Sequence, residues 1–330
     1  MGRLVLRPEA GSALGLLAVF AIFAWFGGAN FLSAGGVASW LNVAAGLGIV
    51  ALPIGLLMIA GHLDLSIGSI IPAASITTAI IAGLFGAPIA LGIAAALGVG
   101  LLVGFVNGLL VVRTRLPSFV VTLATLFAVA GLTLGLSILV AGSTSVALRT
   151  EGFAKAALGQ FLGGRFQVTV LWWLLAVLVA WLVLHHTRYG NWIFAMGGDA
   201  ESARACGVPT ERLTIALYMA SGAAAAFVGL SQAILYNSAQ VSAGQSFVFN
   251  SIIAVVIGGV LLTGGFGSVL GIVLGTVTFA IVNQGIYFTG LDANWASLII
   301  GVLLLLAVLT NNAFRKLALA YSARREGDRG

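Results

Sequence analysis

Long apolar runs alternate with short polar segments along the chain, and the length of these runs predicts membrane-spanning helices. A hydrocarbon core of about 30 Å needs roughly 20 helical residues. The runs are continuous rather than alternating, which favours helices over barrel strands, because a helix satisfies its own backbone hydrogen bonds in lipid. The ten predicted spans are 13–33, 40–60, 65–84, 88–112, 118–141, 168–186, 213–236, 250–264, 267–289 and 293–313.

The composition agrees with this pattern. Of the 330 residues, 60% are hydrophobic and only 7% are charged, and the mean hydropathy is +1.14. A water-soluble domain of this length does not have such a composition. We therefore expect an all-α polytopic membrane protein with about ten transmembrane helices. Residues 13–313 would form a single transmembrane domain, preceded by a cytoplasmic segment (1–12) and followed by a basic cytoplasmic tail (314–330).

The basic residues predict the orientation, because Lys and Arg near helix ends stay preferentially in the cytoplasm. With the N-terminus inside, 12 of the 15 basic residues are cytoplasmic, and an even number of spans returns the C-terminus to the same side. The net charge of +6 is thus a topology signal that also favours anionic lipid, and it gives no reason to expect nucleic acid. The cytoplasmic basic residues are Arg3, Arg7, Arg113, Arg115, Arg188, Arg204, Arg212, Arg315, Lys316, Arg324, Arg325 and Arg329; Arg149, Lys155 and Arg165 are outside.

Two connections are too long to be simple turns. This topology places 142–167 in the periplasm and 187–212 in the cytoplasm. Within the second, Asp199 is a predicted N-cap for a short amphipathic helix from about Ala200 to Ala205, which is followed by a glycine at the C-terminal stop position. Such a helix could dock into a cytoplasmic partner, or it could be an ordinary solvated surface helix.

The sequence has no arrangement of residues that predicts an enzyme, a metal site or a cofactor site. His62, His185 and His186 do not have a metal-binding spacing. Neither Lys155 nor Lys316 follows a glycine, so the chain has no phosphate-binding loop for ATP.

One acidic residue, Asp64, lies deep between apolar runs. A charged side chain costs about 2.5–3.5 kcal/mol at the centre of the bilayer, and less near an interface. Asp64 could cap the following helix by accepting a backbone N–H bond from Ser66 or Ile67, or it could take part in substrate passage, and both roles are compatible. Asn107 and Asn283 are polar residues near apolar runs that could line a pathway or bond helix to helix.

Glycine interrupts the hydrophobic pattern in both halves of the chain, at 61–69 and at 264–271. Such interruptions in corresponding segments are typical of the substrate pathway in transporters built from repeats. Gly267, Gly271 and Gly275 are four residues apart, which predicts one helical face that a second helix can approach closely.

Several motifs together resemble the inner-membrane permease subunits of ABC importers for monosaccharides, the group that includes the ribose permease. Their glycine-x-x-aspartate-leucine-serine signature is present, but His62 stands where the family usually has a second glycine. The resemblance covers about residues 40–312. The matching segments are GHLDLSIGS, with Gly61, Asp64, Leu65, Ser66, Gly68 and Ser69, then NGLLVVRTRLPSFVVTLATL from Asn107, TRYGNWIFAMGGDAESARACGV from Thr187, and NSIIAVVIGGVLLTGGFGSVLG from Asn250.

The resemblance implies a multi-pass protein of the bacterial inner membrane that forms the channel half of an importer. It implies as partners two cytoplasmic ATP-binding subunits or one fused tandem ATPase, a second permease copy or paralogue, and an external sugar-binding protein. It implies no cofactor. The residues expected to contact the ATPase are Gly197, Gly198, Glu201, Ala203, Arg204 and Gly207. The pathway is expected near the two glycine-rich breaks and at Asp64, Ser66, Asn107 and Asn283.

Two other classes remain open. An ion-coupled secondary transporter would use Asp64 as its coupling acid. A membrane-embedded enzyme would need a nucleophile, base or metal constellation, which the sequence does not offer. The sequence leaves open which sugar or polyol is carried.

Overall fold

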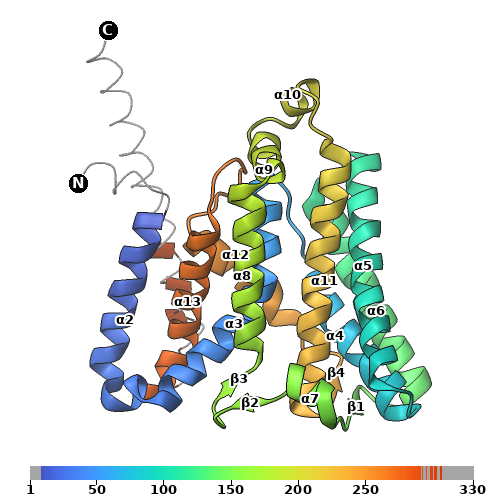
Figure 1. Cartoon of the computed structure of the whole chain (residues 1–330), viewed down its shortest axis with the longest axis vertical. Helices are drawn as coiled ribbons and strands as arrows, with labels where there is room; N and C mark the ends of the chain where they lie inside the picture. The colour runs from blue at the N-terminus through green and yellow to red at the C-terminus, as the bar shows by residue number, and fades with distance from the viewer. Residues whose placement is uncertain are drawn as a thin grey trace.

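The computed structural model describes residues 9–290 and the positions 292, 295, 298–299, 301–302 and 305–306. In this part the chain folds as a helical bundle (Figure 1), in which eight helices are long and apolar enough to cross a membrane. A ninth apolar helix, α12, is shorter. The bundle helices are α2 (Glu9–Leu32), α3 (Ala34–Ile59), α4 (Ile67–Thr78) with its π-helical continuation η1 (Ala79–Leu84), α5 (Ile89–Thr114), α6 (Ser118–Ala141), α8 (Thr169–His186), α11 (Thr210–Tyr236), α12 (Gln245–Ile257) and α13 (Val269–Gly285) with the 3-10 turn η2 (Ile286–Phe288).

The prediction of an all-α polytopic membrane protein is confirmed. The prediction for 250–264 is wrong in its bounds, because α12 begins five residues earlier and ends at Ile257, where Gly258 and Gly259 follow. Its 13 residues make a helix of about 20 Å, too short for a hydrocarbon core of about 30 Å. The predicted span 293–313 falls largely on residues outside the described part, as do residues 1–8 and the tail 314–330.

The two ends of the bundle differ in what they carry (Figure 1). One end, here called the arm end, carries α9 (Arg188–Gly198) and α10 (Ala200–Ala205), and α2 begins on the same side. The other, called the strand end, carries α7 (Gly152–Leu158) and two small antiparallel pairs, β1 (Ser145–Ala147) with β4 (Ser238–Gln240), and β2 (Phe161–Leu162) with β3 (Phe166–Gln167).

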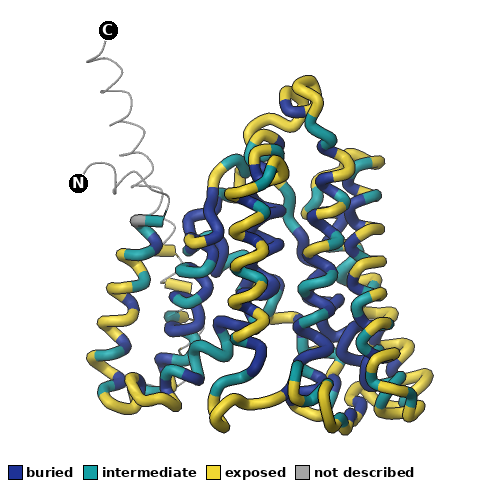
Figure 2. Tube along the Cα trace, viewed as in Figure 1, coloured by how far each residue is buried: buried dark blue, intermediate teal, exposed yellow. Residues whose placement is uncertain are grey.

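Helix α3 lies at the centre of the bundle. Every residue from Leu47 to Ile59 is buried, as expected for a helix that is apolar on all sides and surrounded by others. By contrast, most residues of α5 and α6 are exposed or half-buried (Figure 2). Their exposed leucine, valine and phenylalanine side chains fit a surface that faces lipid.

Helices α5 and α11 meet along a row of glycines. A Cβ atom at Gly100 would lie 2.3 Å from the carbonyl oxygen of Gly222, and one at Gly104 would lie 2.3 Å from that of Tyr218. Gly108 is similarly close to Ile215. The backbones therefore pack closely through small residues at intervals of four, a common mode of helix association in membranes.

The three glycines predicted to form one helical face do not all lie on α13. A Cβ at Gly271 would meet the carbonyl oxygen of Gly258 at 2.2 Å, and one at Gly275 would meet that of Ala254 at 2.1 Å, so both glycines pack against α12. Gly267 lies in the loop before α13, where an added Cβ would meet the side chain of Ile59.

Candidate functional site

The chain between α3 and α4 is a polar break that runs from the arm end back toward the bundle (Figure 1). Its backbone is held from two sides, because the N–H of Leu63 donates to Oγ of Ser118 at 3.0 Å and the hydroxyl of Tyr218 donates to the carbonyl oxygen of Leu63 at 3.0 Å. His62 lies beside Tyr218, with Nε2 3.4 Å from the hydroxyl of Thr214. The break is therefore fixed to α6 and α11.

Asp64 is the centre of a buried polar cluster. One carboxylate oxygen accepts the backbone N–H of Ser66 at 2.9 Å and its hydroxyl at 2.6 Å, and the other accepts the hydroxyl of Ser221 at 2.7 Å. Nδ2 of Asn107 in turn donates to Oγ of Ser66 at 2.8 Å. All four residues are fully buried, with 0% of their surface exposed. Of the two N–H bonds considered for Asp64, the one from Ser66 is present. Helix α4 begins at Ile67 and its N-cap is Ser66, so Asp64 lies before the cap and is not itself the capping residue.

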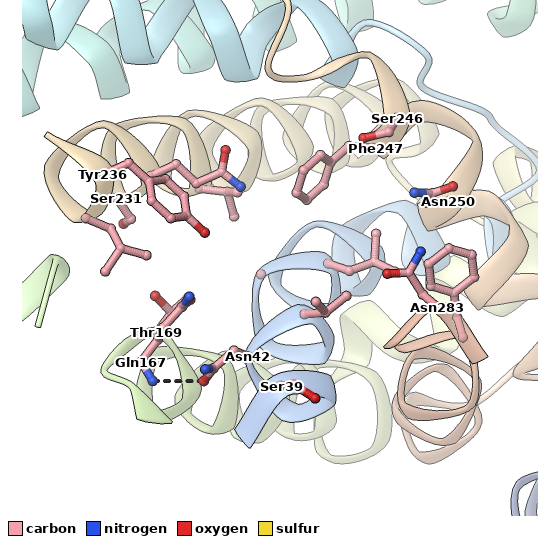
Figure 3. A pocket seen from close by; sticks show the side chains of 17 residues that line it. Ser39, Asn42, Gln167, Thr169, Ser231, Tyr236, Ser246, Phe247, Asn250 and Asn283 are labelled. Carbon is pink, nitrogen blue, oxygen red and sulfur yellow. Dashed lines mark hydrogen bonds between the residues drawn. The ribbon is translucent and has the colours of Figure 1, made fainter. Parts of the chain in front are cut away.

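The second polar feature is a cavity of about 460 Å³ near the strand end (Figure 3). It lies between α3, α8, α11, α12 and α13, and its polar residues surround it rather than gather on one side. The aromatic rings in its lining are those of Tyr236, Phe247 and Phe279. Asn42 closes one edge, where its Oδ1 accepts the backbone N–H of Gln167 at 2.8 Å and its Nδ2 donates to the carbonyl oxygen of Arg165 at 2.9 Å. The polar lining residues are Ser39, Asn42, Gln167, Thr169, Ser231, Gln232, Tyr236, Ser246, Asn250 and Asn283.

The structure thus separates the four residues predicted for the pathway. Asp64, Ser66 and Asn107 form one buried cluster, whereas Asn283 lines the cavity with Asn250. Sequence reasoning missed the other polar residues of the cavity. The available signal was the single amides and hydroxyls inside apolar runs, but their spacing along the chain gives no hint that five helices bring them together.

A third feature, the glycine junction, joins the break to the arm. It consists of Gly61, Gly197, Gly264 and Gly265, packed around the last residue of α3, Ile59. A Cβ at Gly197 would lie 2.4 Å from the backbone nitrogen of Gly265 and even closer to the carbonyl oxygen of Ile59. Both glycine-interrupted segments of the sequence therefore meet the end of α9 at one point.

The arm beyond the junction is α10, whose predicted bounds, Ala200–Ala205, are confirmed. Asp199 is its N-cap and accepts the N–H groups of Glu201 at 2.9 Å and Ser202 at 3.1 Å. The hydroxyl of Ser202 also donates to Asp199 at 3.1 Å. These hydrogen bonds, the two from Ser202 above all, hold the pKa of the Asp199 carboxyl below its ordinary value. After the helix, Gly207 has a φ of +85°, the left-handed conformation that glycine adopts at low cost.

The residues predicted to contact an ATPase differ in exposure. Ala203 is buried and Gly197 is held in the junction, whereas Gly198, Glu201, Arg204 and Gly207 are exposed. An exposed ion pair joins Arg204 to Glu211 at 3.3 Å.

A cleft of about 730 Å³ lies beneath α10, between it, the end of α5 and the start of α11. Its charged lining residues carry both signs: Arg113, Arg115, Arg204, Glu201 and Glu211, with His62 at one edge. This charged cleft at the arm end differs clearly from the cavity near the strand end.

Comparison with known proteins finds one matching family model and relatives that are import permeases. The chain matches the model of the family described as "Branched-chain amino acid transport system / permease component" over residues 36–308. It is 33% identical to the fructose import permease protein of Rhizobium meliloti, covering 88% of this chain and 81% of the relative. It is 29% identical to the ribose import permease protein of Escherichia coli (strain K12), with 92% and 94% covered, and 32% identical to the autoinducer 2 import system permease protein of Photorhabdus laumondii, with 80% and 79% covered. No solved structure gives a significant match.

Proposed function

Because the chain belongs to the branched-chain amino acid transport system / permease component family, we propose that it is the transmembrane subunit of an ATP-driven importer for a monosaccharide or a related polyol. Two of the three relatives are named as import permeases for ribose and fructose, and each aligns over most of this chain. The family name and these relatives suggest different cargoes, and the relatives favour a sugar.

The exposed arm formed by α10 is the observation that best supports an ATP-driven mechanism. Helix α10 projects from the bundle, capped by Asp199 and exposed at Glu201 and Arg204, above a cleft lined by charges of both signs. Charges of both signs at a surface suit recognition of a folded protein partner. Since the chain has no phosphate-binding loop, a partner ATPase would supply the energy.

The arm is coupled closely to the pathway segments. At the glycine junction Gly197 packs directly against Ile59 and Gly265, so we expect the end of α9 to move together with the breaks at 61–69 and 264–271. Docking of an ATPase on α10 would thus be transmitted as a rigid-body shift of α9 to both breaks. In this proposal Gly197 and Gly198 link the arm to the bundle, while Glu201, Ala203, Arg204 and Gly207 shape the docking surface.

The other subunits in this proposal are those that the family resemblance implies. A second permease, identical or related, would complete the channel, and an external binding protein would deliver the sugar to the strand end. Asn283 would line the pathway, and Asp64, Ser66 and Asn107 would hold the break beside it.

The first test is to extract the tagged protein gently from its native membrane and identify the proteins that co-purify. We expect a phosphate-loop ATPase and a secreted solute-binding protein. The companion test is uptake in membrane vesicles, which should stop on ATP depletion and continue when proton and sodium gradients are collapsed. The opposite pattern would support an ion-coupled transporter that uses Asp64, and would overturn the proposal.

A further inference from the structure

The cavity near the strand end has a lining without charge. None of the seventeen residues that line it is Asp, Glu, Lys, Arg or His. Its polar groups are hydroxyls and side-chain amides, which can both donate and accept hydrogen bonds. Its volume of about 460 Å³ falls in the range of about 300–1,000 Å³ typical of small-molecule sites.

Many of these polar groups have no partner within the described part of the protein. Oγ of Ser231 is buried, in a residue only 4% exposed, and has no hydrogen-bond partner there. The side chains of Thr169, Gln232, Ser246 and Asn250 also make no hydrogen bond to the described residues, although they line the same space. Leaving the buried Oγ of Ser231 without a partner costs about 1–3 kcal/mol, which a ligand hydroxyl would recover. Thr169 is also buried, whereas Gln232 and Asn250 are half-buried and Ser246 is exposed, so these groups would exchange water for the hydroxyls of a ligand.

The same lining disfavours ions. A carboxylate, phosphate or ammonium group that entered the cavity would give up part of its hydration without meeting an opposite charge, which is unfavourable. The aromatic rings of Tyr236, Phe247 and Phe279 add apolar surface that suits the C–H face of a ring.

We propose that this cavity is a binding site for one neutral, hydroxyl-rich molecule of about hexose size, and that the permease subunit itself rejects charged analogues. The inference rests on the proposed import function, but it goes further by placing a second step of selection in the membrane. If the external binding protein alone selected the cargo, the cavity in the permease would not need a lining without charge.

The test measures binding to the purified protein in lipid nanodiscs by saturation-transfer difference NMR, which detects weak ligands. The neutral probes are D-ribose, D-fructose, D-glucose, D-galactose, D-xylose and myo-inositol. The charged probes are D-glucuronate, D-glucosamine, D-galacturonate and D-galactosamine, and L-leucine is added as a zwitterionic probe. We expect at least one neutral probe to bind and the charged probes to give at least about tenfold weaker signals.

Two nearly isosteric variants test the site itself. Asn250→Asp and Gln232→Glu each place one negative charge in the cavity, and either is expected to raise the binding of the amino sugars relative to their neutral parents by about tenfold. The control Asn191→Asp adds the same charge on exposed α9 and should leave the preference unchanged. Size-exclusion profiles and thermal midpoints identify a variant that fails to fold, in which case the other one decides.

Equal binding of neutral and charged probes, no binding of any neutral probe, or unchanged preference in both folded variants would overturn the inference. These results leave the proposed function standing if the ATPase still co-purifies. Conversely, neutral-sugar binding without a co-purifying ATPase would retain the site and remove the ATP-driven mechanism.

Discussion

The backbone N–H of Gly265 donates a hydrogen bond of 2.8 Å to the carbonyl oxygen of Ile59, and thereby joins the loop after α12 to the end of α3. Gly197 lies against both partners. Residues more than 200 positions apart in the chain are thus held at one point beneath the arm.

Substitution of Gly197 tests this junction. In Gly197→Ala the new Cβ would overlap the carbonyl oxygen of Ile59, so we expect a loss of about 1–3 kcal/mol of stability and a large loss of uptake. The measurement is the thermal midpoint of the purified protein together with sugar uptake.

The neighbouring glycine provides the control. Gly198→Ala meets no atom within 4 Å, and Gly198 has no positive φ, so this variant should retain the wild-type midpoint. Equal behaviour of the two variants would contradict the close packing described for Gly197.

We expect the loss of stability on substituting Asp64 to depend on whether the new side chain can still accept hydrogen bonds within the buried cluster. Asp64→Leu would leave the hydroxyls of Ser66 and Ser221 and one N–H without an acceptor, at a cost of more than about 3 kcal/mol. Asp64→Asn should cost less than half of that, because the amide oxygen still accepts from Ser66 and the amide N–H groups can donate to Ser221.

Uptake by Asp64→Asn also distinguishes the mechanisms. An ion-coupled transporter would lose uptake with its coupling acid, whereas an ATP-driven permease should retain a substantial part of it. If uptake and thermal midpoint are both unchanged, Asp64 has no part in the pathway.

Lys155 makes a contact at the strand end that we expect to stabilise the protein. Its Nζ donates to the carbonyl oxygens of Ile234 at 2.6 Å and Leu235 at 3.2 Å, and to Oδ1 of Asn237 at 3.0 Å. A cation at this position satisfies the unpaired carbonyls at the end of α11. Lys155→Met should therefore cost about 1–2 kcal/mol. Arg149 is an exposed residue in the same connection, so Arg149→Ala should have little effect on the thermal midpoint. Equal thermal midpoints for the two variants would show that the contact of Lys155 with the end of α11 contributes nothing to stability.

The arm can be tested without disturbing the fold. Glu201→Lys reverses an exposed charge on α10, and Gly207→Trp adds bulk at a residue with nothing within 4 Å. In the presence of either variant the partner ATPase should hydrolyse ATP without transport, or it should no longer co-purify. Strain at the positive φ of Gly207 makes Glu201→Lys the cleaner variant.

The matched control is Glu151→Lys, an exposed charge reversal in the connection at the strand end. It should leave ATPase recovery and transport unchanged. Normal transport by Glu201→Lys would move the docking surface away from α10.

Local features of this fold were predictable from the sequence. The span 118–141 coincides with α6, and the Asp199 cap and α10 follow from short-range capping rules. The bounds of α12 were not predictable in this way, because apolar residues continue past Gly258 and mask the end of the helix. Helix ends depend on capping and packing as well as on hydropathy.

The polar cluster and the cavity could not be predicted from short stretches of the sequence, for a different reason. Ser66 and Asn107 are 41 residues apart, and Asp64 and Ser221 are 157 apart, yet they form hydrogen bonds. Only the packing of α4, α5 and α11 brings them together. The sequence indicated that Asp64 and Asn107 were unusual, but not that they share one cluster.

The charge-free lining of the cavity has a consequence for energetics. A charged solute crossing the membrane would exchange about 2.3 kcal/mol per elementary charge with a potential of 100 mV. A neutral solute in a neutral chamber exchanges none, so its import is electrically silent. The membrane voltage would then set no limit on how far such a solute accumulates.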